Sequence, residues 1–276
     1  MQLRFPNMPE QITKADAKIL EYISNNTEAF LFSSIGKFAA QLGISEATVS
    51  RFVRHVGCRD YKELKRLVTE QIAFEGPAAK MAETLNADAG FTLENWMLRQ
   101  QTYLQKTLES VDKKAFSDAV AAILHAHRVF IHAKSASASL GQLLLFRLRR
   151  MGIETILLPS GGSEVLEGLA QVEKDDIVLL FSFSKVSAEG KMILCRQKEI
   201  GYQTIAFCSR MFVPPAERAD IQLFVYRGEP EEYHSMTAPA AMVDALAVAV
   251  SEALGPDCAK RLSDLHRMKK SYAPDR

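Results

Sequence analysis

Two hydroxyl-rich segments in the second half of the chain each follow directly after a run of apolar residues. The first segment contains Ser135, Ser137 and Ser139, and the second contains Ser182, Ser184 and Ser187. Short hydroxyl side chains, together with free backbone N–H groups at the start of a helix, can hold an anionic group such as a phosphate without a metal ion. Serine is also common in turns and helix caps, so either segment alone has that simpler explanation.

The elements that would position these serines form an α/β domain. Five short apolar runs alternate with helical stretches from Arg128 onward: 128–133, 153–159, 176–184, 202–209 and 220–226. Such runs are typical of strands buried on both faces, and their alternation with helices predicts a doubly wound domain with a five-stranded parallel sheet. The first and third strands can be neighbours at the topological switch point of such a sheet, where both serine segments would face one ligand.

A second set of chemically suited residues lies in the first quarter of the chain, within AAQLGISEATVSRFVRH (39–55). We expect one helix face to carry Ser45, Glu46, Ala47, Thr48, Ser50, Arg51 and Arg54. Hydroxyl and guanidinium groups at this spacing suit DNA phosphates and guanine edges in a major groove. Glu46 would either accept a hydrogen bond from a cytosine amine or only favour the helix N-terminus.

The apolar positions around this face follow the pattern of a helix-turn-helix in an all-α domain. Two helices that cross steeply need a small residue where they touch, here Ala39, and a glycine for a left-handed turn, here Gly43. Ser45 is placed to cap the second helix. The inward stripe of that helix is expected at Val49, Phe52, Val53 and Val56. The alternative is an ordinary helical hairpin with a polar surface, but basic residues crowd the sequence from 51 to 66 and favour DNA binding.

The composition is that of a globular protein with sizeable cores. Of 276 residues, 47% are hydrophobic and 24% are charged, and the net charge of +1 means that any nucleic-acid site must be local. The four cysteines lack metal or redox spacing and are expected to be free thiols in a reducing compartment. We find no signal peptide and no run of about 20 apolar residues, which predicts a cytoplasmic protein with no membrane partner.

The two halves together resemble the RpiR family of bacterial transcriptional regulators, in which an N-terminal helix-turn-helix is joined to a SIS (sugar isomerase) domain that senses a phosphosugar. In the first half, the resemblance is carried by Ser-x-x-Thr-Val-x-Arg-Phe at 45–52 and Gly-x-x-x-Tyr-x-x-x-Lys at 57–65. In the second half, FVPPAERAD (212–220) is similar to a Ser-Pro-Leu-Ala…Ala-Asp segment of the family, and MVDALAVAV (242–250) is similar to its closing helix. The resemblance implies a flavodoxin-like SIS fold.

The effector loops depart from the family pattern. The family's Gly-x-Gly-x-Ser is replaced by AKSAS at 133–137, so that only the last serine keeps its counterpart. The family's Ser-x-Ser-Gly-x-Thr is replaced by SFSKVS at 182–187, with a lysine in place of glycine. We predict effector binding by Ser137, Ser182, Ser184, Ser187, Lys134 and Lys185. The lost glycines matter because glycine lets the backbone approach a phosphate closely, so the lysines either supply the missing charge or mark a different ligand.

These observations predict a DNA-binding transcriptional regulator, not an enzyme, that senses a small anionic metabolite. By the resemblance this is a sugar phosphate, and the controlled genes belong to carbohydrate metabolism. We expect a homodimer or homotetramer on a double-stranded DNA operator, with no catalytic residue, cofactor or metal. The predicted domains are a helix-turn-helix domain at 1–76, a linker and connecting helix at 77–110, and a SIS domain at 111–276.

Two alternatives remain open at this point. The chain could be a SIS-type sugar-phosphate isomerase, for which Glu164, Glu167, Glu189 and His234 are available as the base. It could also be a regulator whose degenerate SIS domain serves only for dimerisation.

Overall fold

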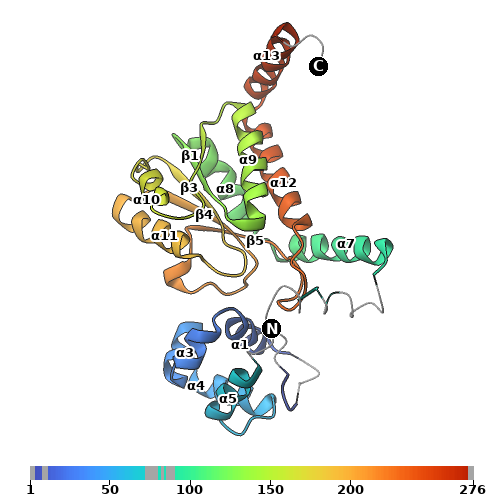
Figure 1. Cartoon of the computed structure of the whole chain (residues 1–276), viewed down its shortest axis with the longest axis vertical. Coiled ribbons are helices and arrows are strands. Elements are labelled where there is room, and N and C mark those ends of the chain that lie inside the picture. Colours follow the sequence, from blue (N-terminus) through green and yellow to red (C-terminus); the bar gives the residue numbers. More distant parts are fainter. Residues whose placement is uncertain (1–3, 8–11, 72–79, 82–83, 85–90, 273–276) are drawn as a thin grey trace. The chain divides into compact units, whose positions relative to one another are not determined.

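The computed structural model describes residues 4–7, 12–71, 80–81, 84 and 91–272 (Figure 1). These residues fall into two compact units. The first contains the described residues up to Arg99 together with 210–215 and 228–234, and the second contains 100–209, 216–227 and 235–272. Most of the expected linker lies outside the described residues, and the domain boundary at 76 stays a prediction.

The first unit contains short helices packed around an aromatic core. They are α1 (Lys14–Asn25), α2 (Thr27–Phe32), α3 (Ile35–Leu42), α4 (Glu46–His55) and α5 (Tyr61–Gln71). Phe30, Phe38 and Phe52 are almost fully buried in this core. Thr13 and Asp16 form reciprocal capping hydrogen bonds, each 3.1 Å long, which start α1. The separate helix α2 was not predicted from the sequence.

The second unit is built on one parallel sheet. Its strands are β1 (Val129–His132), β2 (Thr155–Leu157), β3 (Ile177–Phe181), β4 (Gln203–Cys208) and β5 (Ile221–Phe224). Their order is β2-β1-β3-β4-β5, and every neighbouring pair is parallel. The predicted doubly wound sheet is therefore confirmed, including the pairing of β1 with β3, in which His132 lies opposite Leu180.

Helices cover both faces of this sheet (Figure 1). One face carries α8 (Lys113–His125), α9 (Ala138–Met151) and α12 (Thr237–Leu254), and the other carries α10 (Glu164–Leu169) and α11 (Ala188–Ile200). Side chains of β1 alternate between the two cores, with Val129 and Ile131 in the first and Phe130 in the second. All three are fully buried, which explains why the strands are apolar at every position.

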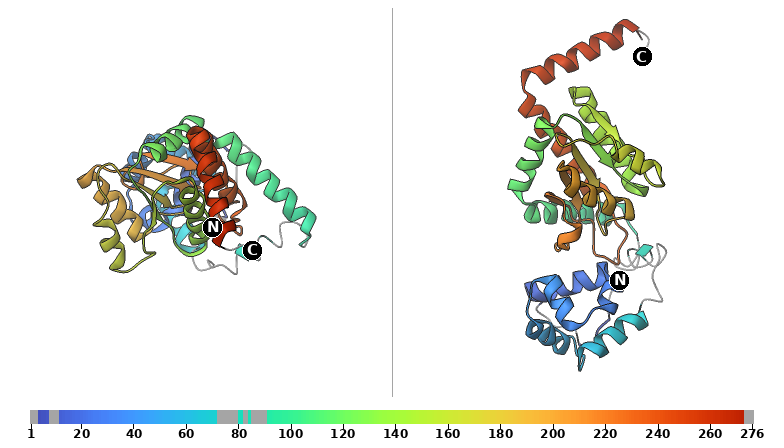
Figure 2. Two further views of the ribbon diagram at one scale, coloured as in Figure 1. Left: turned by 90° about the horizontal axis from the view of Figure 1, so that it is seen from above. Right: turned by 90° about the vertical axis from the view of Figure 1, so that its left-hand side faces the viewer.

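The helices that flank the sheet domain include one with membrane-like composition. By length and composition alone, α12 is apolar enough to cross a membrane, contrary to our expectation that no run qualifies. Its inner face, including Val243, Leu246 and Val250, is nevertheless buried in the core of the sheet domain. Packing on the sheet therefore accounts for its apolar side chains. The following helix, α13 (Pro256–Tyr272), was not predicted and extends beyond the sheet layers (Figure 2). Before the sheet, α7 (Leu93–Ser110) is the predicted connecting helix.

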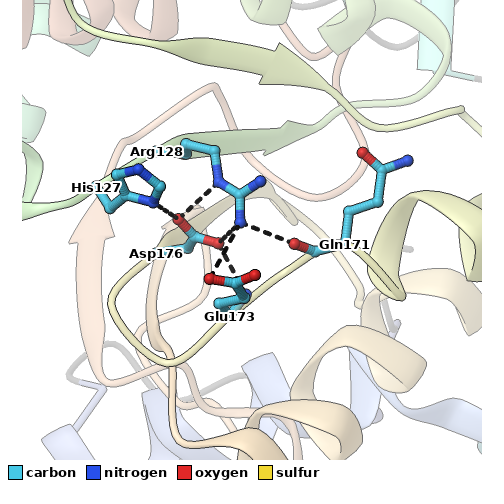
Figure 3. Close-up of polar contacts among 5 residues, drawn as sticks. All are labelled: His127, Arg128, Gln171, Glu173 and Asp176. Atoms are coloured by element: carbon cyan, nitrogen blue, oxygen red, sulfur yellow. Dashed lines mark hydrogen bonds and ion pairs between the residues drawn. The ribbon is translucent and has the colours of Figure 1, made fainter.

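A buried ion pair fixes the amino-terminal edge of the sheet (Figure 3). Arg128, just before β1, donates from Nε and Nη2 to the two carboxylate oxygens of Asp176, at 3.1 and 2.7 Å. The Asp176 carboxylate also accepts from the Glu173 amide at 2.7 Å, and its side chain has no exposed surface. This bidentate pair joins the starts of β1 and β3 at the edge opposite the serine segments.

Candidate functional site

The turn between α3 and α4 has the geometry that the sequence predicts. Gly43 ends α3 with φ 63° and ψ 37°, a left-handed conformation. The amide of Ile44 donates to the carbonyl of Ala39 at 3.0 Å, and Ala39 is buried where the helices meet. A Cβ at Gly43 would have no neighbour within 4 Å, so backbone conformation alone restricts this position to glycine.

The polar face of α4 is ordered by a chain of local hydrogen bonds. The Ser45 hydroxyl accepts from the Thr48 amide at 3.1 Å, which confirms Ser45 as the N-cap of α4. The two hydroxyls lie 2.9 Å apart, and Arg51 Nη2 donates to Thr48 Oγ1 at 3.3 Å. The Arg51 side chain is thus held in position before it meets any ligand.

The remaining predicted DNA-contacting residues lie on the same face. Ala47 and Arg54 are exposed and Ser50 is half-buried, whereas Val49 and Phe52 point into the core. The carboxylate of Glu46 folds back on α3, where its Oε1 would lie 2.7 Å from a Cβ added at Gly36. Basic side chains continue beyond α4 at Arg59, Lys62 and Arg66, which are exposed, while Lys65 donates to the Ser33 carbonyl at 3.0 Å.

In the sheet domain, the first serine segment follows β1 and forms the short turn η2 (Ser135–Ser137). Ser135 has φ 52°, and it is the only non-glycine residue with positive φ in the described part of the chain. It stands where the family pattern has its second glycine, so the loop keeps a glycine-like conformation without glycine. Ser137 is buried, and its hydroxyl donates to the Lys134 carbonyl at 2.8 Å.

The second serine segment follows β3 and leads into α11. Ser182 is buried and its amide continues the pairing to β4, donating to the Phe207 carbonyl at 2.9 Å. The half-buried Ser184 accepts a hydrogen bond from Arg227 Nη2 at 3.3 Å. Ser187 caps α11 by accepting from the Gly190 amide at 3.1 Å.

One ion pair joins the two segments. Lys134 Nζ, after β1, lies 2.8 Å from Glu189 Oε1 in the first turn of α11. The hydrogen bond from Lys134, supported by those from the Glu189 amide and the Ser187 hydroxyl, lowers the pKa of Glu189 to about 2. Lys185, by contrast, is exposed. Of the two predicted lysines, Lys134 therefore already has a carboxylate partner within the chain.

Three residues near these segments were not predicted as effector-site residues. His132 at the end of β1 is buried, which lowers its pKa, and its Nε2 has no hydrogen-bond partner in the described structure. Glu189 was considered only as an isomerase base. Arg227 follows β5 directly, and a charged residue at the carboxyl end of a parallel strand was the sequence signal that could have identified it.

Comparison with known proteins assigns both halves. A sequence model for the helix-turn-helix domain of the rpiR family matches residues 1–75, and a model for the SIS domain matches residues 122–249. The chain belongs to the rpiR family. HTH-type transcriptional regulator TTE0211 of Caldanaerobacter subterraneus subsp. tengcongensis is 24% identical over 226 residues, which cover 79% of this chain and 77% of that protein. YbbH of Bacillus subtilis is 23% identical, with the same shares of each chain covered.

Solved structures share the fold. The Vibrio vulnificus NanR protein, complexed with ManNAc-6P, aligns with a TM-score of 0.59 at 18% identity over 95% of each chain. The sugar isomerase domain of the RpiR transcription factor from Sphaerobacter thermophilus aligns with a TM-score of 0.57 at 24% identity, over 62% of this chain and 96% of that one. Escherichia coli CFT073 c3406, in complex with a sugar phosphate, gives 0.50 at 22% identity, over 58% and 88%. This rpiR-family protein is accordingly a transcriptional regulator with a helix-turn-helix domain and a SIS domain.

Proposed function

We propose that this regulator binds a sugar phosphate at its two serine segments and that binding changes its affinity for a DNA operator. The observation that carries the proposal is the contact between Lys134 and Glu189, which brings the segments after β1 and β3 to one place. Ser137, Ser182, Ser184 and Ser187 belong to these segments. Hydroxyls and helix-start amides at the carboxyl ends of adjacent parallel strands are suited to an anionic group.

On the DNA side, the proposed contacts are those of α4. Its exposed face presents Thr48, Arg51 and Arg54, and we expect the arginines to bind phosphates or guanine edges. A homodimer or homotetramer would place two such helices about 34 Å apart, one turn of DNA. Effector binding would shift the oligomer between arrangements that match this spacing and arrangements that do not. We assign such a protein to the cytoplasm and its targets to carbohydrate genes.

Neither alternative has an observation in its favour. For an isomerase, Glu189 is held by Lys134, and Glu164 and Glu167 are exposed on α10. His234 belongs to a segment of the first unit. We therefore propose a regulator without enzyme activity. A SIS domain used only for dimerisation predicts no response to any metabolite, which the next experiment tests.

The test uses the full chain with ManNAc-6P, arabinose 5-phosphate and the corresponding unphosphorylated sugars as probes. We expect a phosphorylated sugar to raise the melting temperature and to change affinity for a DNA fragment that the protein selects from a random pool. Ser184→Ala should weaken the sugar-phosphate effect by about 1.5–3 kcal/mol while leaving ligand-free DNA affinity intact. Ser139→Ala is the matched control, because Ser139 is exposed and its hydroxyl bonds only within its own turn, to the Ala136 carbonyl. If no phosphorylated sugar changes either quantity, the dimerisation alternative is correct.

A further inference from the structure

Arg227 is a buried cation without a carboxylate partner among the described residues. Only 6% of the residue is exposed. Its Nη2 donates to Ser184 Oγ at 3.3 Å, its Nη1 lies 3.8 Å from Met236 Sδ, and its guanidinium carbon lies 4.3 Å from the centre of the Phe183 ring. Its Nε is buried and has no hydrogen-bond partner in the described structure. A hydroxyl, a thioether and an aromatic face are weak substitutes for an anion.

The same chain contains an arginine whose needs are met. Arg128 uses its Nε and Nη2 together, and both donate to the Asp176 carboxylate (Figure 3). In Arg227 the equivalent pair of nitrogens has one hydroxyl for Nη2 and nothing for Nε. Burying a guanidinium without a counter-charge is costly, and here burial lowers the pKa of Arg227 to about 10, which leaves it charged at neutral pH. The comparison indicates that an anion is the missing partner.

The other positive features nearby are already used. Glu189 occupies the start of α11 and pairs with Lys134, so the chain itself supplies the anion at that position. Ser184 is different, because it accepts from Arg227 and keeps its own proton to donate. It is also only half-buried, so a ligand can reach it.

We propose that Arg227 is the buried cation of the effector site: it holds the Ser184 hydroxyl as a donor and supplies the positive charge that an anionic ligand group requires. The inference rests on the proposed function and refines it, because it assigns the ligand's phosphate to the Ser184–Arg227 position and not to Lys134. A phosphate or a carboxylate shares the necessary chemistry. Arg227 is therefore a positioning and charge-supplying residue that acts on the ligand through Ser184.

The test measures the binding of ManNAc-6P, arabinose 5-phosphate, inorganic phosphate and a sugar acid to the full chain by calorimetry and thermal shift. We expect Arg227→Met to weaken binding of the anion that the wild type prefers by ten-fold or more, and Arg227→Lys to recover part of it because the charge remains. Without ligand, Arg227→Met should melt no lower than the wild type, because it removes an unpaired buried charge. Arg149→Met, at an exposed arginine in the last turn of α9, is the matched control.

Coupling to Ser184 gives a second readout. In a Ser184→Ala background, Arg227→Met should have a much smaller effect on affinity, because the hydroxyl that it positions is gone. Wild-type affinity in Arg227→Met would overturn this inference and leave the proposed function standing. A lowered melting temperature without loss of affinity would assign Arg227 a purely structural role and would also overturn it. If Arg227→Met does not fold, unchanged affinity in Arg227→Lys and additive effects with Ser184→Ala would do the same. No binding of any anion to the wild type would refute the proposed function itself, and this inference with it.

Discussion

Neutralising Glu189 tests whether the two serine segments are held together as the structure describes. Glu189→Gln keeps the size of the side chain but removes the charge that faces Lys134 at 2.8 Å. The Glu189 side chain is 14% exposed and that of Lys134 is 39% exposed. The pKa of Glu189 is lowered from 4.5 to about 2, chiefly by the hydrogen bond from Lys134. A carboxyl whose pKa is lower in the folded state stabilises that state when it is ionised.

The size and the sign of the effect follow from this shift. The full shift corresponds to about 3 kcal/mol. Because Lys134 is partly exposed, solvent screening reduces this value, and we expect Glu189→Gln to cost about 1–2 kcal/mol at pH 7. The stabilisation is complete above the unfolded-state pKa of 4.5 and is lost as the pH falls from there towards 2. The difference between variant and wild type should therefore shrink steadily below about pH 4.5.

The assay is thermal unfolding of the full chain between pH 3 and pH 8, followed by circular dichroism. At pH 7 we expect the transition that includes the sheet domain to fall by about 2–8 °C in Glu189→Gln. Glu199→Gln is the matched control, since Glu199 lies on the same helix but forms only an exposed pair with Arg196. The reasoning would be refuted by a Glu189→Gln variant as stable as the wild type at pH 7, or by one whose deficit does not change with pH.

Three further predictions concern other parts of the molecule. Arg51→Ala or Arg54→Ala should each cost about 1–3 kcal/mol of operator binding, measured by fluorescence anisotropy, with an unchanged melting temperature because both side chains are exposed; wild-type affinity in the double variant would contradict the assigned face. Gly43→Val should lower the first thermal transition, at a cost of about 1–3 kcal/mol, because valine is strained at φ 63°, whereas Gly43→Asn should be tolerated; equal stability of the two would place the strain elsewhere. Asp176→Asn should cost about 3–5 kcal/mol in urea unfolding, because it leaves Arg128 without its counter-ion; a loss below about 1 kcal/mol would show that the pair is not essential.

Much of the fold was predictable because periodicity and burial dictate it. The five apolar runs correspond to the five strands, since each lies in a sheet covered on both faces and has no solvent-facing position to mark with a polar residue. The turn at Gly43 and the cap at Ser45 were predictable because only a few residue types satisfy those backbone positions. The helix α13 was missed because its exposed, charged sequence shows no clear core-facing pattern, with only Cys258 buried.

The charge arrangement at the serine segments was not predictable. Sequence reasoning considered Lys134 and Lys185 alike, yet one is bonded to Glu189 and the other is exposed. The difference depends on side chains that are 55 residues apart in the chain and meet only in the folded sheet. Arg227 was missed for the same reason, because Ser184 is 43 residues away from it. Local patterns identify which segments reach the ligand end of a parallel sheet, but the pairing of charges there is a property of tertiary structure.

The two glycines that this chain lacks, relative to the family pattern, differ in their physical role. Ser135 takes the position of one and still adopts φ 52°, a left-handed conformation that costs a serine on the order of 1 kcal/mol. Lys185 takes the position of the other, and its φ is not positive, so that position does not require glycine for conformation. The first loop therefore retains its shape despite the substitution, and the second needs no special backbone geometry. Loss of the glycine pattern is consequently weak evidence against ligand binding, and the choice of ligand depends on the charges that Glu189, Lys134 and Arg227 present around these loops.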